Sequence, residues 1–75
     1  MRKIEYTNFI LEEDKMGVVV YDKDYTLICL LTLDHIDDLA KEELFSGDES
    51  KAKEVLDRVI YFMEIITRQL TKLIS

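Results

Sequence analysis

The sequence predicts a small α+β domain in which a three-stranded antiparallel β-meander is packed by a short helix and a long C-terminal helix. Three observations favour this class. Residues 1–33 contain runs of β-branched and aromatic residues separated by short polar turns, whereas residues 34–74 carry apolar residues at helical spacing. Proline is absent and glycine occurs twice, so nothing marks a boundary within the 75 residues. We therefore expect one domain over residues 1–75.

The strands are expected at about residues 4–11, 17–21 and 25–33. In the first run the alternation of apolar residues breaks at Asn8, which predicts a bulge or bend. Residues 12–15 are charged and are expected to form the first turn. The short polar segment at residues 22–24 joins two β-rich runs and predicts a hairpin.

The third run contains five consecutive apolar residues, from Leu27 to Leu31. A strand with no polar residue for a solvent-facing side is typically covered on both faces. We therefore expect this strand to be central in the sheet. Cys29, the only cysteine, is expected to act as a small core residue rather than as a nucleophile.

The helices are expected at about residues 34–45 and 48–74. Thr32 or Asp34 can cap the first helix, and Gly47 marks its end. Ser46 has the spacing of a capping box with Glu49, while Asp48 is a competing cap for the second helix. Neither glycine nor proline interrupts the chain after that point, so the second helix should run almost to residue 75.

The second helix carries more apolar surface than one neighbour can cover. Its apolar residues span an arc wider than the ~100° stripe of an ordinary surface helix. At about 1.5 Å per residue it is also about twice as long as a typical strand. We expect a homodimer in which the terminal helices pack together; a bent or shorter helix folded wholly onto its own sheet is the alternative. The expected dimer interface comprises Phe62, Ile65, Ile66, Leu70, Leu73 and Ile74.

The net charge of −6 is concentrated in residues 34–50, which hold seven acidic residues and one basic residue. Such a segment attracts a basic surface and repels phosphate backbones, so direct nucleic-acid binding is disfavoured. We expect the segment to form an acidic face that binds a partner; solubility alone is the competing interpretation. The expected face comprises Asp34, Asp37, Asp38, Glu42, Glu43, Asp48 and Glu49.

No pattern in the sequence indicates catalysis, so we predict no catalytic residues, no cofactor and no metal. His35 is the only histidine, and no phosphate-binding glycine loop or paired-cysteine motif occurs. Asp34, Asp38 and Glu42 recur at i+4 and could bind Mg²⁺ or Ca²⁺, but such a face is more often only solvated. Residues 1–5 lack the apolar run of a signal peptide, and no stretch is apolar enough to span a membrane. We expect a cytoplasmic protein that is not an enzyme.

These patterns favour a small acidic, dimeric protein–protein interaction module that acts as an inhibitor, adaptor or regulator of a larger partner with a basic surface. By analogy of composition, small acidic proteins of phage and other mobile elements can mimic nucleic acid by presenting carboxylates where phosphates bind. A small-molecule sensor or regulatory subunit is the alternative. A DNA-binding regulator is kept in reserve because residues 51–75 carry a charge of +2, from five basic and three acidic residues.

Overall fold

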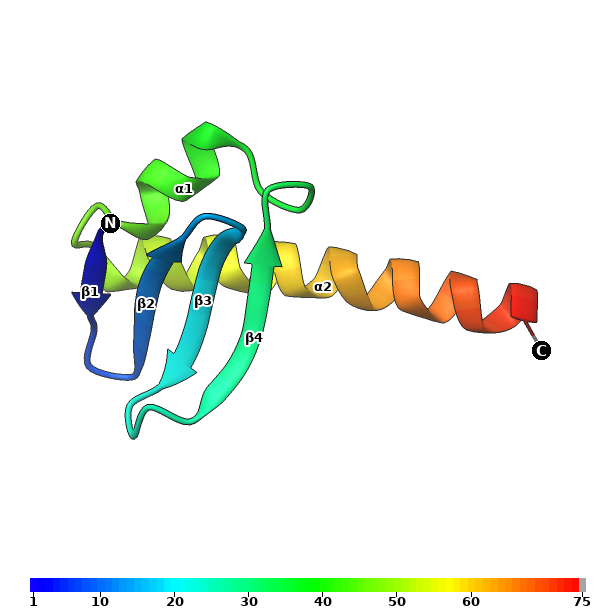
Figure 1. Cartoon of the computed structure of the whole chain (residues 1–75), viewed down its shortest axis with the longest axis horizontal. Coiled ribbons are helices and arrows are strands. Elements are labelled where there is room, and N and C mark those ends of the chain that lie inside the picture. Colours follow the sequence, from blue (N-terminus) through cyan, green and yellow to red (C-terminus); the bar gives the residue numbers. More distant parts are fainter. Residues whose placement is uncertain (75) are drawn as a thin grey trace.

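The computed structural model describes the backbone of residues 1–74 and the side chains of residues 1–65 and of Arg68. Its architecture is α+β, as predicted, with an antiparallel sheet followed by two helices (Figure 1). The sheet has four strands, so the prediction of three was wrong. The elements are β1 (Lys3–Glu5), β2 (Phe9–Asp14), β3 (Gly17–Asp22), β4 (Leu27–Thr32), α1 (Asp38–Leu44) and α2 (Glu49–Ile74).

The extra strand arises because the run predicted as one strand at residues 4–11 is folded back on itself. β1 and β2 pair with Ile4 opposite Leu11, and the Tyr6 amide donates a 2.9 Å hydrogen bond to the Phe9 carbonyl across the turn. The Glu49 carboxylate accepts hydrogen bonds from the Thr7 amide and the Asn8 side chain, which satisfies polar groups of this turn. The expected bend at Asn8 is therefore a complete reversal that is stabilised from α2.

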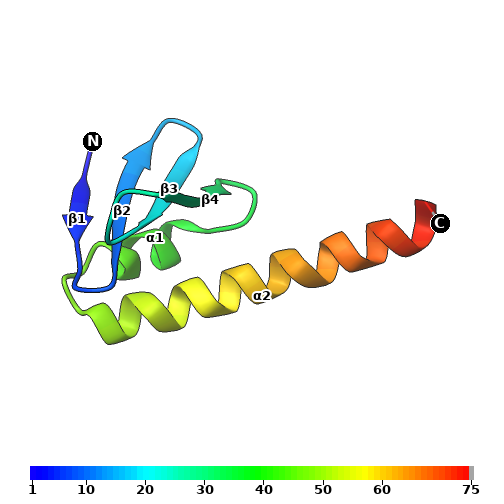
Figure 2. The same cartoon turned by 90° about the horizontal axis from the view of Figure 1, so that it is seen from below.

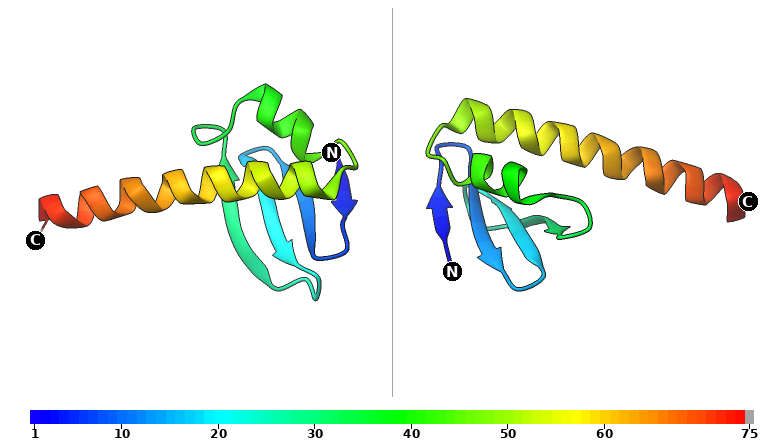
Figure 3. Two further views of the ribbon diagram at one scale, coloured as in Figure 1. Left: turned by 180° about the vertical axis from the view of Figure 1, so that it is seen from behind. Right: turned by 90° about the horizontal axis from the view of Figure 1, so that it is seen from above.

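The strands follow one another in the order β1-β2-β3-β4, each antiparallel to the next. The hairpin between β3 and β4 is confirmed at the predicted polar segment, whereas the charged segment predicted as the first turn lies mostly within β2, and the β2–β3 turn is at residues 15–16. One face of the sheet buries Leu11, Val18, Val20 and Leu31. Both helices lie against this face (Figures 2 and 3).

β4 lies at the edge of the sheet, so the prediction of a central strand was wrong. Leu27, Ile28 and Leu30 are 62%, 54% and 38% exposed, whereas Leu31 is buried beneath the helices. An apolar run predicts burial, but it does not determine at which position in the sheet the strand lies. The uncharged strand therefore leaves an apolar edge.

The first helix is shorter than the predicted residues 34–45, because residues 33–35 form a turn. In this turn the His35 amide donates a 2.9 Å hydrogen bond to the Thr32 carbonyl. Asp37, rather than Thr32 or Asp34, caps α1 through a 2.7 Å hydrogen bond that its carboxylate accepts from the Ala40 amide.

The long second helix is confirmed to within one residue of its predicted start. The Asp48 carboxylate accepts a hydrogen bond from the Lys51 amide at 3.2 Å, so Asp48 is its cap. Ser46 instead donates through its hydroxyl to the Glu43 carbonyl, and the alternative capping box does not form.

The first half of α2 completes the core. Ala52, Val55 and Val59 are buried against the sheet, together with Leu44 of α1. The 26 residues of α2 make a helix about 39 Å long. Figures 1 and 3 show it starting beside β1, crossing one face of the sheet past β2, β3 and β4, and continuing well beyond β4. In the described part of the chain, none of the helices combines the length and the apolar character that a membrane span requires.

Candidate interaction surfaces

Several carboxylates of the predicted acidic face also bind groups within the fold. Asp37 and Asp48 cap the two helices, and Glu49 binds the β1–β2 turn. Asp34 lies in the turn after β4, and Asp38 lies in the first turn of α1; both are exposed. Asp34 therefore lies outside the helix, and the expected i+4 series of Asp34, Asp38 and Glu42 on one helical face was wrong.

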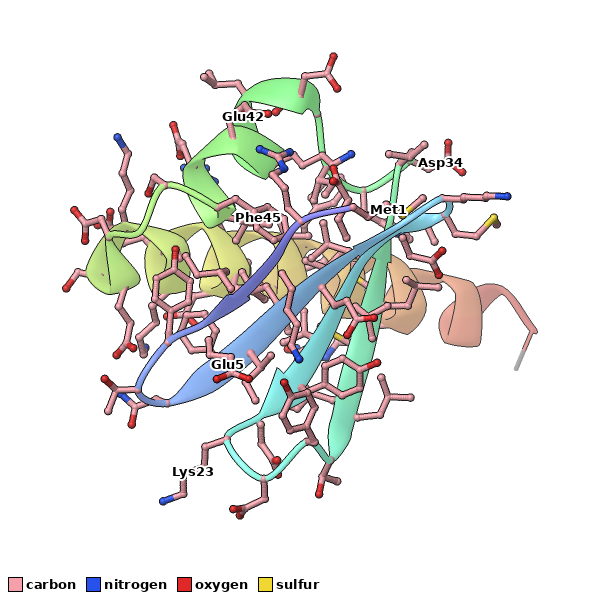
Figure 4. All side chains as sticks on the ribbon, turned by 60° about the vertical axis from the view of Figure 1, so that its left-hand side comes forward. Met1, Glu5, Lys23, Asp34, Glu42 and Phe45 are labelled. Carbon is pink, nitrogen blue, oxygen red and sulfur yellow. The ribbon has the colours of Figure 1, made fainter. Side chains whose placement is uncertain are left out.

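Glu42, which is labelled on α1 in Figure 4, belongs to an ion-pair network that ties the N-terminal segment to this helix. Its carboxylate lies 3.0 Å from the Arg2 guanidinium, which also pairs with Glu13 at 3.2 Å. Lys41 approaches the same Glu13 carboxylate at 2.7 Å. Hydrogen bonds from Arg2 and Lys41 lower the pKa of Glu13 to about 2, and hydrogen bonds to Glu42 and Glu13 raise the pKa of Arg2. The network partly neutralises this side of α1.

A groove of about 450 Å³ lies between α1 and α2. Leu39, Tyr61 and Phe62 line it and are 70%, 63% and 56% exposed, so large apolar side chains face solvent here. The groove arises because α1, at seven residues, is only about 10 Å long and leaves most of α2 uncovered. The remaining lining residues are His35, Ile36, Asp37, Ala40, Glu43, Arg58, Val59 and Ile65.

Three charged residues also line this groove. Asp37 and Glu43 come from α1 and its cap, and Arg58 comes from α2. His35 is held by a 2.7 Å hydrogen bond between its Nδ1 and the Thr32 hydroxyl. The α1–α2 groove therefore combines exposed apolar side chains with two carboxylates of the predicted acidic face.

A second groove, of about 430 Å³, lies on the other side of α2, between this helix and the edge strand β4. Its lining combines Ile28 and Cys29 of β4 with residues of α2, and burial raises the pKa of the Cys29 thiol. A central strand at residues 27–31, as predicted, would have a neighbouring strand on both sides. The groove exists because β4 is instead at an edge of the sheet. Its lining residues on α2 are Ile60, Met63, Glu64 and Arg68.

The residues predicted for a dimer interface fall into two groups. Phe62 is exposed and Ile65 is partly buried, and both line the α1–α2 groove. The other four, Ile66, Leu70, Leu73 and Ile74, lie outside the side chains that the structure describes.

Within the described residues, no group of three His, Cys, Asp or Glu side chains is arranged to hold a metal ion. No protein-family model, curated protein or solved structure matches the chain. The described residues form two grooves with mainly apolar linings, one on each side of α2.

Proposed function

We propose that this chain is a small acidic, dimeric protein-interaction module that acts as an inhibitor, adaptor or regulator of a larger partner with a basic surface. The observation that carries the proposal is the α1–α2 groove, where Leu39, Tyr61 and Phe62 expose large apolar surface beside acidic side chains. Exposed apolar patches with a polar rim are typical of protein-binding sites. The partner's contact segment is then an amphipathic helix with basic residues beside its apolar face.

The chemistry of the groove supports this occupant. Apolar anchors at helical spacing on the partner would bury Phe62 and Leu39, in the way that grooves between helices receive amphipathic helices. Lys or Arg residues flanking those anchors would meet Asp37 and Glu43 of the groove lining. Asp38, exposed at the start of α1, adds a further negative charge to the approach. Opposite-charge steering should therefore make the association rate fall as salt rises.

The dimeric part of the proposal is supported by the length of α2. Strands spaced about 4.8 Å apart give a four-stranded sheet about 14 Å between its outer strands, compared with about 39 Å for the helix. A second copy of the chain is the commonest way in which a protein covers such a projection.

The test begins with affinity purification of the tagged protein from its native host and identification of the protein that co-elutes. Titration of that partner should show that Phe62→Glu and Leu39→Glu each weaken binding at least about tenfold, because a carboxylate would be buried in the apolar contact. Met16→Glu is the matched control, since Met16 is equally apolar and exposed but lies in the β2–β3 turn. A partner whose affinity is unchanged by both groove variants would contradict the proposal.

A small-molecule sensor or regulatory subunit is the second candidate, and the size of the α1–α2 groove favours it. Its volume of about 450 Å³ is within the range of about 300–1,000 Å³ typical of small-molecule sites. A native mass spectrum of the purified protein that contains a stoichiometric co-purified ligand would support this candidate. The exposure of Leu39 and Tyr61 favours a protein partner, because small-molecule sites usually enclose most of their ligand.

A further inference from the structure

We infer that two copies of the chain join edge to edge through β4, forming one continuous eight-stranded sheet, with α2 of each copy lying in the groove between β4 and α2 of the other. This arrangement specifies, and rests on, the self-association proposed above. The surface that the second copy would cover consists of the edge of β4 and the residues of the β4–α2 groove.

The two edges of the sheet differ in a way that selects β4. β1 has only three residues, and Lys3 and Glu5 place charges on its edge. β4 has six residues, none of them charged, and exposes Leu27, Ile28 and Leu30. Sheets normally protect an edge with charges, prolines or short strands, because an uncharged edge pairs readily with another strand. β1 is short and charged, whereas β4 has neither charges nor prolines and departs from a regular edge only at Ile28, the extra residue between the pairs Tyr21–Leu27 and Val20–Cys29.

We assign this edge to a second copy of the chain because α2 projects on the same side of the sheet as the β4 edge. α2 crosses behind the sheet and projects beyond β4, which is the side where a strand added to β4 would lie (Figures 1 and 3). Eight strands would span about 34 Å between the outermost strands, close to the ~39 Å length of α2. The part of α2 that projects from one sheet would therefore lie behind the sheet of the second copy.

The groove between β4 and α2 is the place where the second α2 fits. Ile28 and Ile60 from opposite walls give it an apolar lining, and Glu64 and Arg68 carry opposite charges one helical turn apart. Two-fold symmetry makes the α2 helices antiparallel, so Glu64 of each copy can lie beside Arg68 of the other. The surface is thus complementary in charge to itself, which favours an identical partner over an unrelated strand.

Symmetry also restricts the register of β4 on its copy. Directly opposed residues in an antiparallel pair point to the same face, so a two-fold axis must place one residue opposite itself. The central residues of β4 are Cys29 and Leu30. Opposed Cα atoms lie about 4.5–5.5 Å apart, which a disulfide can span. A cysteine at one of these two positions should therefore form a disulfide with the same residue of the second copy.

Cross-linking and light scattering together test the arrangement. Wild-type protein at micromolar concentration should scatter as twice the chain mass of 8.9 kDa. Oxidation with copper–phenanthroline should link the copies through Cys29, or through the cysteine of the Cys29→Ser/Leu30→Cys variant. The control variant Cys29→Ser/Lys3→Cys carries its thiol on the opposite edge and should stay unlinked.

Ile28→Lys should raise the dimer dissociation constant at least about tenfold, because a charge would enter the apolar β4–α2 groove. Leu30→Lys should also weaken the dimer, because it would bring two like charges close together across the two-fold axis. Both side chains are exposed in one copy, so far-ultraviolet circular dichroism should be unchanged. Leu39→Lys, in the other groove, should leave the dimer intact. Three results would each overturn the β4 arrangement: a dimer that persists in both β4 variants, a dimer that forms no disulfide at either position, or a dimer that is lost with Leu39→Lys. Any of them would leave the proposed self-association standing. A wild-type monomer would overturn both.

Discussion

The Tyr6 hydroxyl donates a 2.7 Å hydrogen bond to the carbonyl oxygen of Leu44, the last residue of α1. The same hydroxyl accepts a 3.2 Å hydrogen bond from the Gly47 amide. One side chain at the β1–β2 turn therefore satisfies a backbone group at the end of α1 and another within the α1–α2 connection. The position of α1, and with it the α1–α2 groove, depends in part on this contact.

Tyr6→Phe should lower the free energy of unfolding by about 1 kcal/mol, because it leaves a helix-end carbonyl without its donor while the ring contact with Phe9 remains. Urea denaturation measures the change. Tyr61→Phe is the matched control, since its exposed hydroxyl is solvated by water and should be dispensable. Equal effects of the two substitutions would show that the hydroxyl of Tyr6 does not contribute.

Gly17→Ala should destabilise the protein by at least about 3 kcal/mol, through strain and overpacking together. Gly17 has a φ of +146°, and an added Cβ would lie 1.9 Å from the Leu31 carbonyl oxygen. Gly47 is the comparison, because its φ is +93° but nothing lies within 4 Å of an added Cβ. Gly47→Ala should cost only about 1 kcal/mol. Thermal denaturation should rank the two variants in this order.

The ion pairs of Glu13 should make stability depend on pH in the acid range. Because the pKa of Glu13 is lowered from 4.5 to about 2 in the folded chain, its contribution is fully present above pH 4.5 and is lost as the pH falls towards 2. Glu13→Gln should reduce stability at pH 7 and flatten the fall in stability between pH 4.5 and 2. Denaturation curves across this range measure both effects. An unchanged slope in the variant would contradict the assignment.

Asp37 and Asp38 are neighbours with different expected roles. Asp37→Ala should lower the free energy of unfolding by about 1 kcal/mol, because Asp37 caps α1. Asp38→Ala should cost only a few tenths of a kcal/mol, because Asp38 acts only through its charge at the start of the helix. Urea denaturation of both variants tests this difference. Partner-binding experiments should therefore reverse Asp38, since reversal of Asp37 would disturb the fold.

Several elements could be predicted from the sequence because their causes are local. The polar segment at residues 22–24 reverses the chain between two apolar runs, and the Asp22 carboxylate accepts hydrogen bonds from the amides of Asp24 and Thr26. Asp48 likewise marks the start of α2, whereas α1 ends at Leu44, three residues before Gly47. Signals of this kind act within a few residues, so they do not depend on where the rest of the chain lies.

The candidate surfaces were predictable only in part. Helical spacing identified Phe62 and Ile65 as apolar residues beyond the needs of the core, and both line the α1–α2 groove. The acidic segment was also evident, but its sequence did not reveal that Glu42 pairs with Arg2, forty residues away. The sequence does not distinguish a carboxylate that pairs within the fold from one that binds another protein.

The sequence by itself determined the α+β class, the β3–β4 hairpin and the long second helix, because turn residues, caps and apolar periodicity act locally. Tertiary structure alone decided that residues 4–11 fold into two strands, since the reversal is held by Glu49 at the start of α2. It also placed the apolar strand β4 at an edge of the sheet. Apolar side chains favour any cover that removes them from water, so the identity of that cover depends on the arrangement of the whole chain.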